Sequence, residues 1–432
     1  MVLNELLKKE VPVSKVFNIT FLVGIYFLPL FSFLGYMEAQ VISIVLALLI
    51  VFLIRSDYFY LVLPMMIFYY SQLVLPGGIA LFRVYTILFL IKIISEKKIT
   101  TNKRLLIPFT LMSLYCVIVV SKWDPKTAFT IILDLFVVII YISSFLTNKE
   151  NIVNFFKWFS IATFSTVIYG IWSINSGLNS YYYINGVWLE VTRFTGTFGD
   201  PNYFGFYINI AIFSLLILGN FKKTIKVILL MIFYFALIAT VSMTGLICNL
   251  LGLFILMSFK NGSIFKKNLI VSSMLIISLI LYNLSMNYSI PVLSDTAERI
   301  NNTINNFTTG NFVELSSDRN VIWSNHLQYY FEQPIYNILF GGNYITDYGF
   351  DLNKFSSVTH NALIDMLLNF GLIGFMVLIS TFLFSTIIYL KMYIQTKENF
   401  FLVLVMSKYV WLFYSFSLSM FPSWKFNLFF LF

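Results

Sequence analysis

Charged residues are scarce in this sequence. They make up only 11% of its 432 residues, whereas soluble globular domains carry about 25%. So few charged side chains cannot cover a water-facing surface, which excludes a soluble enzyme. Glycine and proline, with 20 and 10 residues, are also too few for a collagen-like or disordered chain.

Apolar residues are abundant: 59% of the chain is hydrophobic and 19% is aromatic. A bilayer crossing needs about 20 apolar residues, so the sequence predicts an all-α, polytopic membrane protein with about 13–14 transmembrane helices. The first apolar run, Val16 to Gly35, is long enough to span and lacks a small-residue cleavage site, so we expect it to remain as a membrane helix. The predicted spans are 17–35, 39–54, 58–75, 79–94, 105–121, 127–146, 158–175, 202–219, 225–242, 244–259, 268–285, 361–390 and 400–419. The apolar tail 424–432 is either a shortened fourteenth helix or no span.

The basic residues indicate orientation. The net charge of +9 would suit nucleic acid, but the cations lie in short clusters between apolar runs, so we expect no nucleic-acid partner. Most of the 28 Lys and Arg residues fall in loops that alternate onto one side of the membrane. The positive-inside rule then predicts a cytoplasmic N-terminus.

Two long polar segments lie on the predicted outer side. One runs from about Asn175 to Asn202, and the other, 286–359, is the longest polar region of the chain. A structureless loop of that length is unusual, so we expect a folded extracytoplasmic cap with a functional role. The chain is therefore predicted as one helical membrane domain, 1–432, that carries this cap.

His360 is a candidate catalytic residue where the long outer segment meets the next span. Thr359 is the predicted N-cap, which would place His360 on the first helical turn. Ile364, Gly371 and Gly374 would then share its helix face, and the glycines would admit another helix. The alternative is an interfacial histidine with a packing role only.

The segment around Arg193 is the second candidate. Asp200 as N-cap with Pro201 at the first helical position is a favourable helix start. Gly196 and Gly199 allow tight turns close to a ligand. Two helix N-termini on the outer face would favour an anion. The alternative is that Arg193 extends to lipid head groups.

Arg319 is the third candidate, with a salt bridge to Asp318 or a solvated loop charge as the alternative. Asp365 and Asn369, spaced i, i+4, are predicted to face away from His360 and to link helices. A catalytic role of Asp365 stays open because a carboxylate five residues from a histidine is suitably close.

Several motifs are absent. The sequence has no Walker loop, dinucleotide fingerprint, His-Glu-x-x-His motif or Asp-x-Asp pair on the outer face. Its two cysteines, Cys116 and Cys248, lie in apolar segments, which predicts small buried hydrophobic residues and excludes a disulfide framework. We therefore expect chemistry without a cofactor or a bound metal.

The outer motifs resemble those of the Wzy-type O-antigen polymerase and O-antigen ligase superfamily. The segment Arg193-Phe-Thr-Gly-Thr-Phe-Gly-Asp-Pro-Asn202 is similar to its Arg/Gly/Asp-Pro-Asn motif. Further matches, in the same order, are Asp318-Arg319-Asn-Val-Ile-Trp323, Phe340-Gly341-Gly342-Asn343, and His360-Asn361 followed by Gly371 and Gly374. They cover residues from about 190 to 375, and only the hydropathy pattern matches before that.

The resemblance implies a metal-independent glycosyltransferase of the GT-C type, whose donor is an oligosaccharide on a polyprenyl diphosphate. Arg193 and Arg319 would bind the diphosphate, and His360 would be the base that activates the acceptor hydroxyl. Supporting residues would be Asp200, Asn202, Asn361 and Asp365. One departure is Met243, which stands where many members carry an arginine.

Three functions remain. The favoured one is polymerisation of lipid-linked repeat units into a capsular, O-antigen-type or exopolysaccharide at the outer face of a bacterial cytoplasmic membrane. A ligase that transfers a lipid-linked glycan to another acceptor is the second. A flippase or transporter of lipid-linked oligosaccharide is the third, although such proteins more often show repeats and midplane charges. The resemblance also implies the lipid bilayer, a flippase and a chain-length regulator as partners.

Overall fold

The computed structural model describes ten main stretches of the chain, which form two compact units, 1–92 and 93–432. The described stretches are 26–31, 37–53, 62–69, 149–175, 180–184, 187–191, 193–219, 221–259, 319–341 and 359–418, with isolated short segments in 74–91, at 114–115 and in 305–309. The predicted spans 127–146 and 268–285, and most of 17–35 and 105–121, lie outside them.

In its described residues the first unit contains helices α3 (Met37–Leu53) and α4 (Leu63–Phe68), a short helical segment at 26–31 and a short hairpin. Helix α3 coincides with the predicted span 39–54. Helix α4, which has Pro64 in its first turn, is buried along its whole length. Strands β1 (Val74–Leu75) and β2 (Ile79–Ala80) pair antiparallel.

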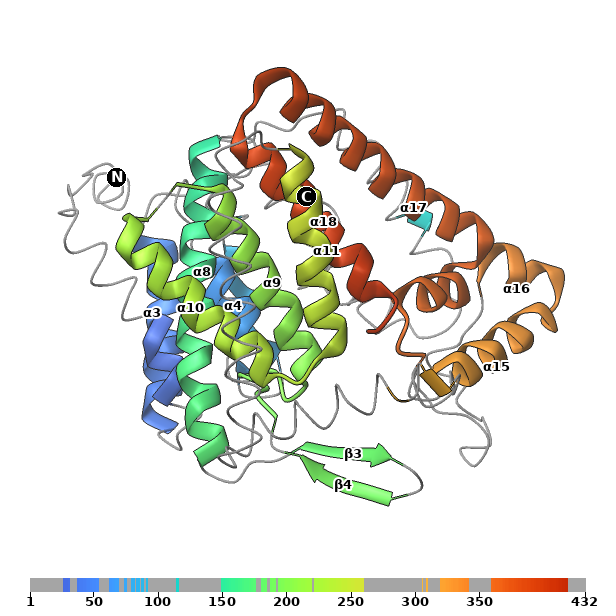
Figure 1. Cartoon of the computed structure of the whole chain (residues 1–432), viewed down its shortest axis with the longest axis horizontal. Helices are drawn as coiled ribbons and strands as arrows, with labels where there is room; N and C mark the ends of the chain where they lie inside the picture. The colour runs from blue at the N-terminus through green and yellow to red at the C-terminus, as the bar shows by residue number, and fades with distance from the viewer. Residues whose placement is uncertain are drawn as a thin grey trace. The chain divides into compact units, whose positions relative to one another are not determined.

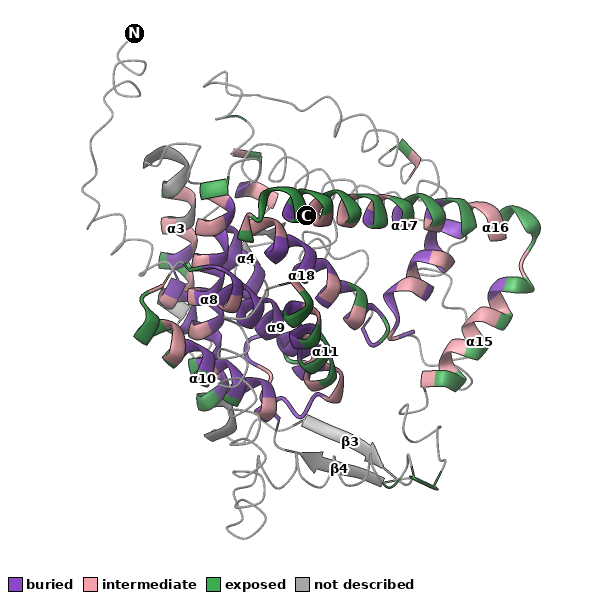
Figure 2. Ribbon diagram, turned by 45° about the horizontal axis from the view of Figure 1, so that its top comes forward, coloured by how far each residue is buried: buried purple, intermediate pink, exposed green. Residues whose placement is uncertain are grey.

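The second unit is a helical bundle, as the all-α prediction requires. Its long helices are α8 (Lys149–Asn175), α9 (Pro201–Ile217), α10 (Lys223–Ala239), α11 (Met243–Phe259), α17 (Ala362–Thr396) and α18 (Asn399–Ser415). Helix α9 contacts α8, α10, α11 and α18 and lies at the centre (Figure 1). It is apolar on all sides and almost wholly buried (Figure 2), as expected of a central helix.

Membrane-length helices are few within the described residues. Two of them, Lys149–Trp172 and Ala362–Thr396, are long and apolar enough to cross a bilayer. Three more apolar helices, α9, α11 and α18, have 17 residues each, close to the lower limit of about 17 residues for a span.

Helix α17 covers the predicted span 361–390 but is bent within it, at Gly371. Gly371 has φ +64°. The position where another residue would carry its Cβ atom is filled by the backbone of Gly341, whose own φ is +88°. A Cβ on Gly371 would lie 2.3 Å from the Gly341 nitrogen. The Tyr115 hydroxyl donates to the Phe370 carbonyl at 2.5 Å beside the bend. The helix therefore has a short arm, 362–370, and a long arm, 372–396.

The predicted external cap is helical where it is described. Helices α15 (Arg319–Phe331) and α16 (Ile335–Phe340) form a hairpin against the short arm of α17. Its core consists of Tyr330, Ile364 and Leu368, with Trp323 and Leu327 packed against it. Trp323, Leu327 and Tyr330 follow a helical spacing on one face of α15, which explains why this otherwise polar helix docks there.

A second hairpin precedes the Arg193 segment. Strands β3 (Ser180–Ile184) and β4 (Val187–Val191) pair antiparallel with Ile184 opposite Val187. We did not predict it, although the sequence carries a signal: Asn185-Gly186, a favoured two-residue hairpin connection, lies between aromatic and β-branched residues.

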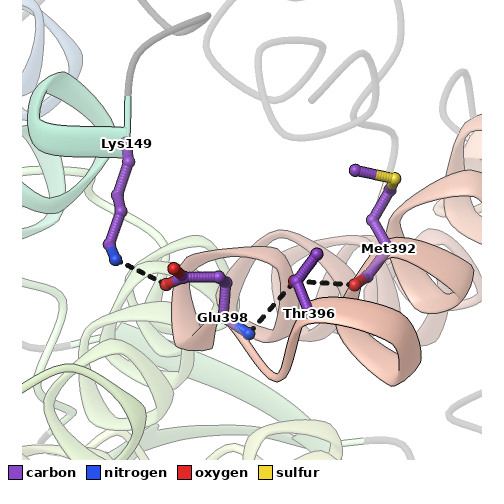
Figure 3. A network of polar contacts seen from close by, with 4 residues as sticks. All are labelled: Lys149, Met392, Thr396 and Glu398. Carbon is purple, nitrogen blue, oxygen red and sulfur yellow. Dashed lines mark hydrogen bonds and ion pairs between the residues drawn. The ribbon is translucent and has the colours of Figure 1, made fainter.

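An ion pair joins the start of α8 to the turn between α17 and α18. Lys149 Nζ, at the start of α8, lies 2.5 Å from Glu398 Oε2, between α17 and α18 (Figure 3). Both side chains are well exposed, so the pair contributes at most about 1 kcal/mol. It marks the end of the bundle opposite to the N-terminus of α17.

Candidate functional site

Arg193 is buried and held at the end of α10. Its Nε donates to the Thr240 carbonyl at 3.0 Å, and the Phe194 backbone N–H donates to the Ala239 carbonyl at 3.0 Å. These carbonyls belong to the C-terminal turn of α10, where backbone acceptors lack helical partners. Arg193 is only 6% exposed, so its side chain faces the interior of the protein.

The predicted start of α9 is confirmed. Asp200 Oδ1 accepts the backbone N–H groups of Asn202 at 2.7 Å and Tyr203 at 3.3 Å, and Pro201 is the first helical residue. Gly196 and Gly199 have φ values of +55° and +70°. The chain therefore turns back tightly between Arg193 and the helix, as expected.

Asn202 links α9 to the loop before α11. Its Oδ1 accepts from the Ser242 hydroxyl at 2.7 Å, and Ser242 Oγ in turn accepts from the Gly245 backbone N–H at 3.1 Å. Met243, the next residue, begins α11 and is half-buried. Met243, where the resemblance would lead us to expect an arginine, thus lies at the same end of the bundle as Arg193 and is apolar.

Helix α15 contributes two residues one turn apart. Arg319 is its first residue and is half-buried, and Trp323 follows on the same face. The Trp323 indole N–H donates to the Thr359 carbonyl at 2.9 Å. The helix that presents Arg319 is therefore tied to the segment that presents His360.

His360 lies before α17, not on its first turn, and the predicted N-cap is wrong. Asn361 is the N-cap: its Oδ1 accepts the backbone N–H groups of Leu363 at 3.0 Å and Ile364 at 3.1 Å. Thr359 Oγ1 instead accepts the Asn361 N–H at 3.0 Å. Since His360 is outside the helix, it does not share a helix face with the glycines.

The backbone of His360 is strained. Its φ is +52°, in the left-handed region, which costs a residue with a side chain roughly 1–2 kcal/mol. The hydrogen bonds made by Thr359 and Asn361 on either side hold this conformation. Such strain in a tightly held residue is frequent at functional sites.

Asp365 faces the His360 segment, contrary to our prediction. Its Oδ1 accepts from the Thr359 hydroxyl at 2.5 Å. Asn369 Nδ2 donates to the Asp365 carbonyl at 2.7 Å, within the same helix. Neither contact links two helices, so the Asp365 carboxylate supports the turn that carries His360.

The three candidate segments converge electrostatically. Burial lowers the pKa of His360, nearby Arg319 lowers it further, and Asp200 acts in the opposite direction. Burial likewise lowers the pKa of Arg193 to about 9, which leaves it charged at neutral pH; Asp200 opposes this shift and Arg319 adds to it. The pKa of Arg319 is lowered by burial and raised by Asp200. Residues up to 167 positions apart (360 − 193) therefore share one charged environment.

Sequence reasoning missed a tyrosine at this site. Tyr203, on the first turn of α9, interacts electrostatically with both Asp200 and Asp365. It therefore lies near both Asp200 and Asp365. Its place directly after the Asp-Pro-Asn motif was the available signal.

A buried polar network beneath the site was also missed. Asn209 Nδ2 donates to the Gly205 and Gly245 carbonyls and to the Tyr414 hydroxyl, each at 3.1 Å. Asn249 Nδ2 donates to Asn209 Oδ1 at 2.9 Å. The network joins α9, α11 and α18 and locks the helices that support the site. Polar residues within apolar runs were its signal.

No family model matches the sequence, and no curated protein is significantly similar to it. Within the described part of the chain, no group of three or more His, Cys, Asp or Glu side chains is arranged to hold a metal ion.

Proposed function

We propose that the chain is a multi-pass protein of a bacterial cytoplasmic membrane, with its N-terminus in the cytoplasm and the candidate site outside. Long rows of exposed apolar side chains on the bundle support this, because water-soluble monomers rarely expose such surfaces. They are Ile225, Ile228, Met231 and Phe235 on α10; Ile247, Leu250, Leu251, Phe254 and Met257 on α11; and Met376, Val377, Leu383, Phe384, Ile387 and Ile388 on α17.

The function that fits this site best is glycosyl transfer from a polyprenyl-diphosphate-linked oligosaccharide, and specifically polymerisation of lipid-linked repeat units into a surface polysaccharide. The observation that carries it is the convergence of Arg193 and Arg319 with His360. Helices α9, α15 and α17 all begin here, so their positive dipole ends add to the two guanidinium charges. A diphosphate is the ligand that such an arrangement favours.

The proposed reaction uses His360 as the base. A neutral imidazole takes the proton from the acceptor hydroxyl, and that oxygen attacks the anomeric carbon of the donor. The bond between this carbon and the diphosphate oxygen breaks, and the polyprenyl diphosphate leaves with the electron pair. Arg193 and Arg319 stabilise the charge that develops on it. The lowered pKa of His360 keeps the base neutral at neutral pH.

The two guanidinium groups supply the cationic charge that a leaving diphosphate needs, so we propose that no metal or other cofactor takes part. Activity should then persist in a chelator. Loss of activity that added Mg²⁺ restores would overturn this part of the proposal.

Ligase and transporter functions are the alternatives. A ligase would use the same residues on a different acceptor. A transporter would need the arginines to bind diphosphate but would not need a base, and a strained, half-buried histidine beside the arginines favours bond formation. The partners that we propose are the bilayer, a flippase and a chain-length regulator.

His360→Gln tests the proposal. Glutamine keeps the size and hydrogen bonding of histidine but cannot act as a base near neutral pH, so we expect polymerisation to fall by about 10²–10⁴-fold. Cells should accumulate single repeat units on lipid at the outer leaflet. The control is His326→Gln, since His326 contacts the Ile322 carbonyl of its own helix.

Other outcomes would identify the alternatives. Normal polymer from a stable His360→Gln protein would contradict a base at this position. Repeat units trapped at the cytoplasmic leaflet would indicate a transporter. Transfer to a separate acceptor without chain growth by the wild-type protein would indicate a ligase.

A further inference from the structure

The turn between α15 and α16 exposes a cluster of apolar side chains. Phe331 is 67% exposed, Ile335 is 69% exposed and Tyr336 is 47% exposed. Pro334, between them, is exposed as well. We call these four residues the apolar tip. By contrast, Tyr330 of the same hairpin is buried and packs against Ile364 and Leu368 of α17.

The apolar tip lies close to the outer end of a lipid-facing helix arm. Helix α16 begins at Ile335 and ends beside Gly341, whose backbone touches that of Gly371. Its six residues span about 9 Å. The long arm of α17 starts directly after Gly371, and its first residues, Leu372, Ile373 and Met376, are exposed and apolar.

These dimensions bring the tip within reach of the lipid head groups. The hydrocarbon core of a bilayer is about 30 Å thick and the whole bilayer about 40–45 Å, which leaves roughly 5–8 Å for each head-group layer. The long arm of α17, residues 372–396, would be about 37 Å long if straight, enough to cross the core with a tilt. A tip about 9 Å from its outer end, measured along α16, therefore falls within reach of this layer.

The chemistry of the tip also suits that layer. Tyrosine is enriched at membrane interfaces because its ring is apolar and its hydroxyl is polar. Glu332 is at the same turn and accepts a hydrogen bond from Gln328 Nε2 at 3.0 Å. A carboxylate there is compatible with the hydrated interface and not with the hydrocarbon core.

We propose that the apolar tip inserts into the head-group layer of the outer leaflet and anchors the α15–α16 hairpin to the membrane. This rests on the proposed membrane placement but not on the proposed reaction. The anchor would hold α15, which carries Arg319 at its other end, at a constant height above the bilayer. The occupant is bilayer lipid, continuous with the lipid around the long arm of α17.

Nitroxide accessibility tests the anchor. The full chain, with Cys116 and Cys248 replaced by alanine, would be labelled at Phe331→Cys or Ile335→Cys in nanodiscs of phosphatidylglycerol and phosphatidylethanolamine. We expect both labels to collide more with oxygen, and less with a water-soluble nickel chelate, than a label at Asn320→Cys. Asn320 is the matched control because it is exposed at the opposite end of α15.

A label at Met376→Cys, on the exposed side of the long arm, separates the possible failures. If Met376 is in lipid but the tip labels collide with nickel as often as Asn320, the anchor is wrong. Tip labels shielded from both oxygen and nickel would indicate a protein contact and would also overturn it. If Met376 itself collides mainly with nickel, the membrane placement fails together with the anchor. None of these outcomes depends on catalytic activity.

Discussion

The indole N–H of Trp323 donates to the carbonyl oxygen of Thr359 at 2.9 Å, directly before His360. This single hydrogen bond ties α15 to the turn that precedes α17. Arg319 lies one helical turn before Trp323. The hydrogen bond therefore also fixes the position of Arg319 relative to His360. Thr359 is further held through Asp365 and Asn361. Arg319 and His360, though far apart in sequence, therefore share this support.

Trp323→Phe should weaken that support while keeping an aromatic ring in the core. A typical protein hydrogen bond contributes about 0.5–1.5 kcal/mol, so we expect polymerisation to fall roughly 2–10-fold, because His360 is less firmly held. The matched control is Tyr330→Phe, which removes the hydrogen bond from the Tyr330 hydroxyl to the Ile338 carbonyl in the same hairpin. Equal loss in both variants would indicate general destabilisation of the hairpin.

The pH dependence of activity should report the pKa of His360. The base must be neutral, and its pKa lies below the ordinary value of 6.5 because of burial and Arg319, so activity should fall only as the pH drops below about 6.5. Asp200→Asn removes a negative charge that raises this pKa, so the acid limb should move to lower pH. Asparagine is also a good N-cap, so the start of α9 is preserved.

Arg319→Gln should move the acid limb in the opposite direction, because it removes a positive charge that lowers the His360 pKa. The residual activity of this variant is measured at saturating donor. Glu332→Gln, at the far end of α15, is the control and should leave the profile unchanged. Shifts of the same sign in the Asp200 and Arg319 variants would contradict the assignment of the limb to His360.

Replacing Arg193 or Arg319 should reduce activity less with lysine than with alanine. Lysine keeps the charge but loses the planar fork that binds two phosphate oxygens, so Arg193→Lys and Arg319→Lys should be partly active. The alanine variants should lose roughly 1.5–3 kcal/mol of binding per charged contact, or about 10–150-fold in donor affinity. Polymer length and donor binding are the measurements. Lys149→Ala, at the opposite end of the bundle, is the control, and wild-type behaviour of all four arginine variants would exclude both residues from the site.

The loss of stability caused by Gly205→Ala should be partly reversed by Tyr414→Phe. A Cβ at Gly205 would lie 2.7 Å from the Tyr414 hydroxyl oxygen but 3.8 Å from the ring carbon that carries it. Gly205→Ala should therefore destabilise the protein by about 1–3 kcal/mol through overpacking. Tyr414→Phe removes the clashing oxygen, so the double variant should be more stable than Gly205→Ala alone.

Thermal unfolding in detergent would measure this pair. Gly219→Ala is the control, since a Cβ there meets no atom within 4 Å. A double variant that is less stable than either single variant would show that Asn209 depends on the Tyr414 hydroxyl more than Gly205 needs the space.

Much of the fold follows from local features of the sequence. The lengths of the apolar runs alone located α9, α10, α11 and α18 to within a few residues. A helix whose surface faces the protein core or lipid needs a continuous apolar segment. The start of α9 was equally readable, since Asp200 and Pro201 act through hydrogen bonds and backbone angles within one turn. Arg193, Arg319 and His360 were recognised by motif, each in its own segment.

Tertiary contacts decided the rest. Thr359 and Asn361 are both suitable N-caps, and the hydrogen bond from Thr359 to Asp365 left the cap to Asn361. The bend in α17 depends on the backbone of Gly341, thirty residues earlier (371 − 341). Such choices are made by groups distant in sequence, which a pattern of neighbouring residues does not record. The sequence by itself thus determined the apolar helices and the polar motifs between them. Packing between segments determined how Arg193, Arg319 and His360 come to share one charged environment.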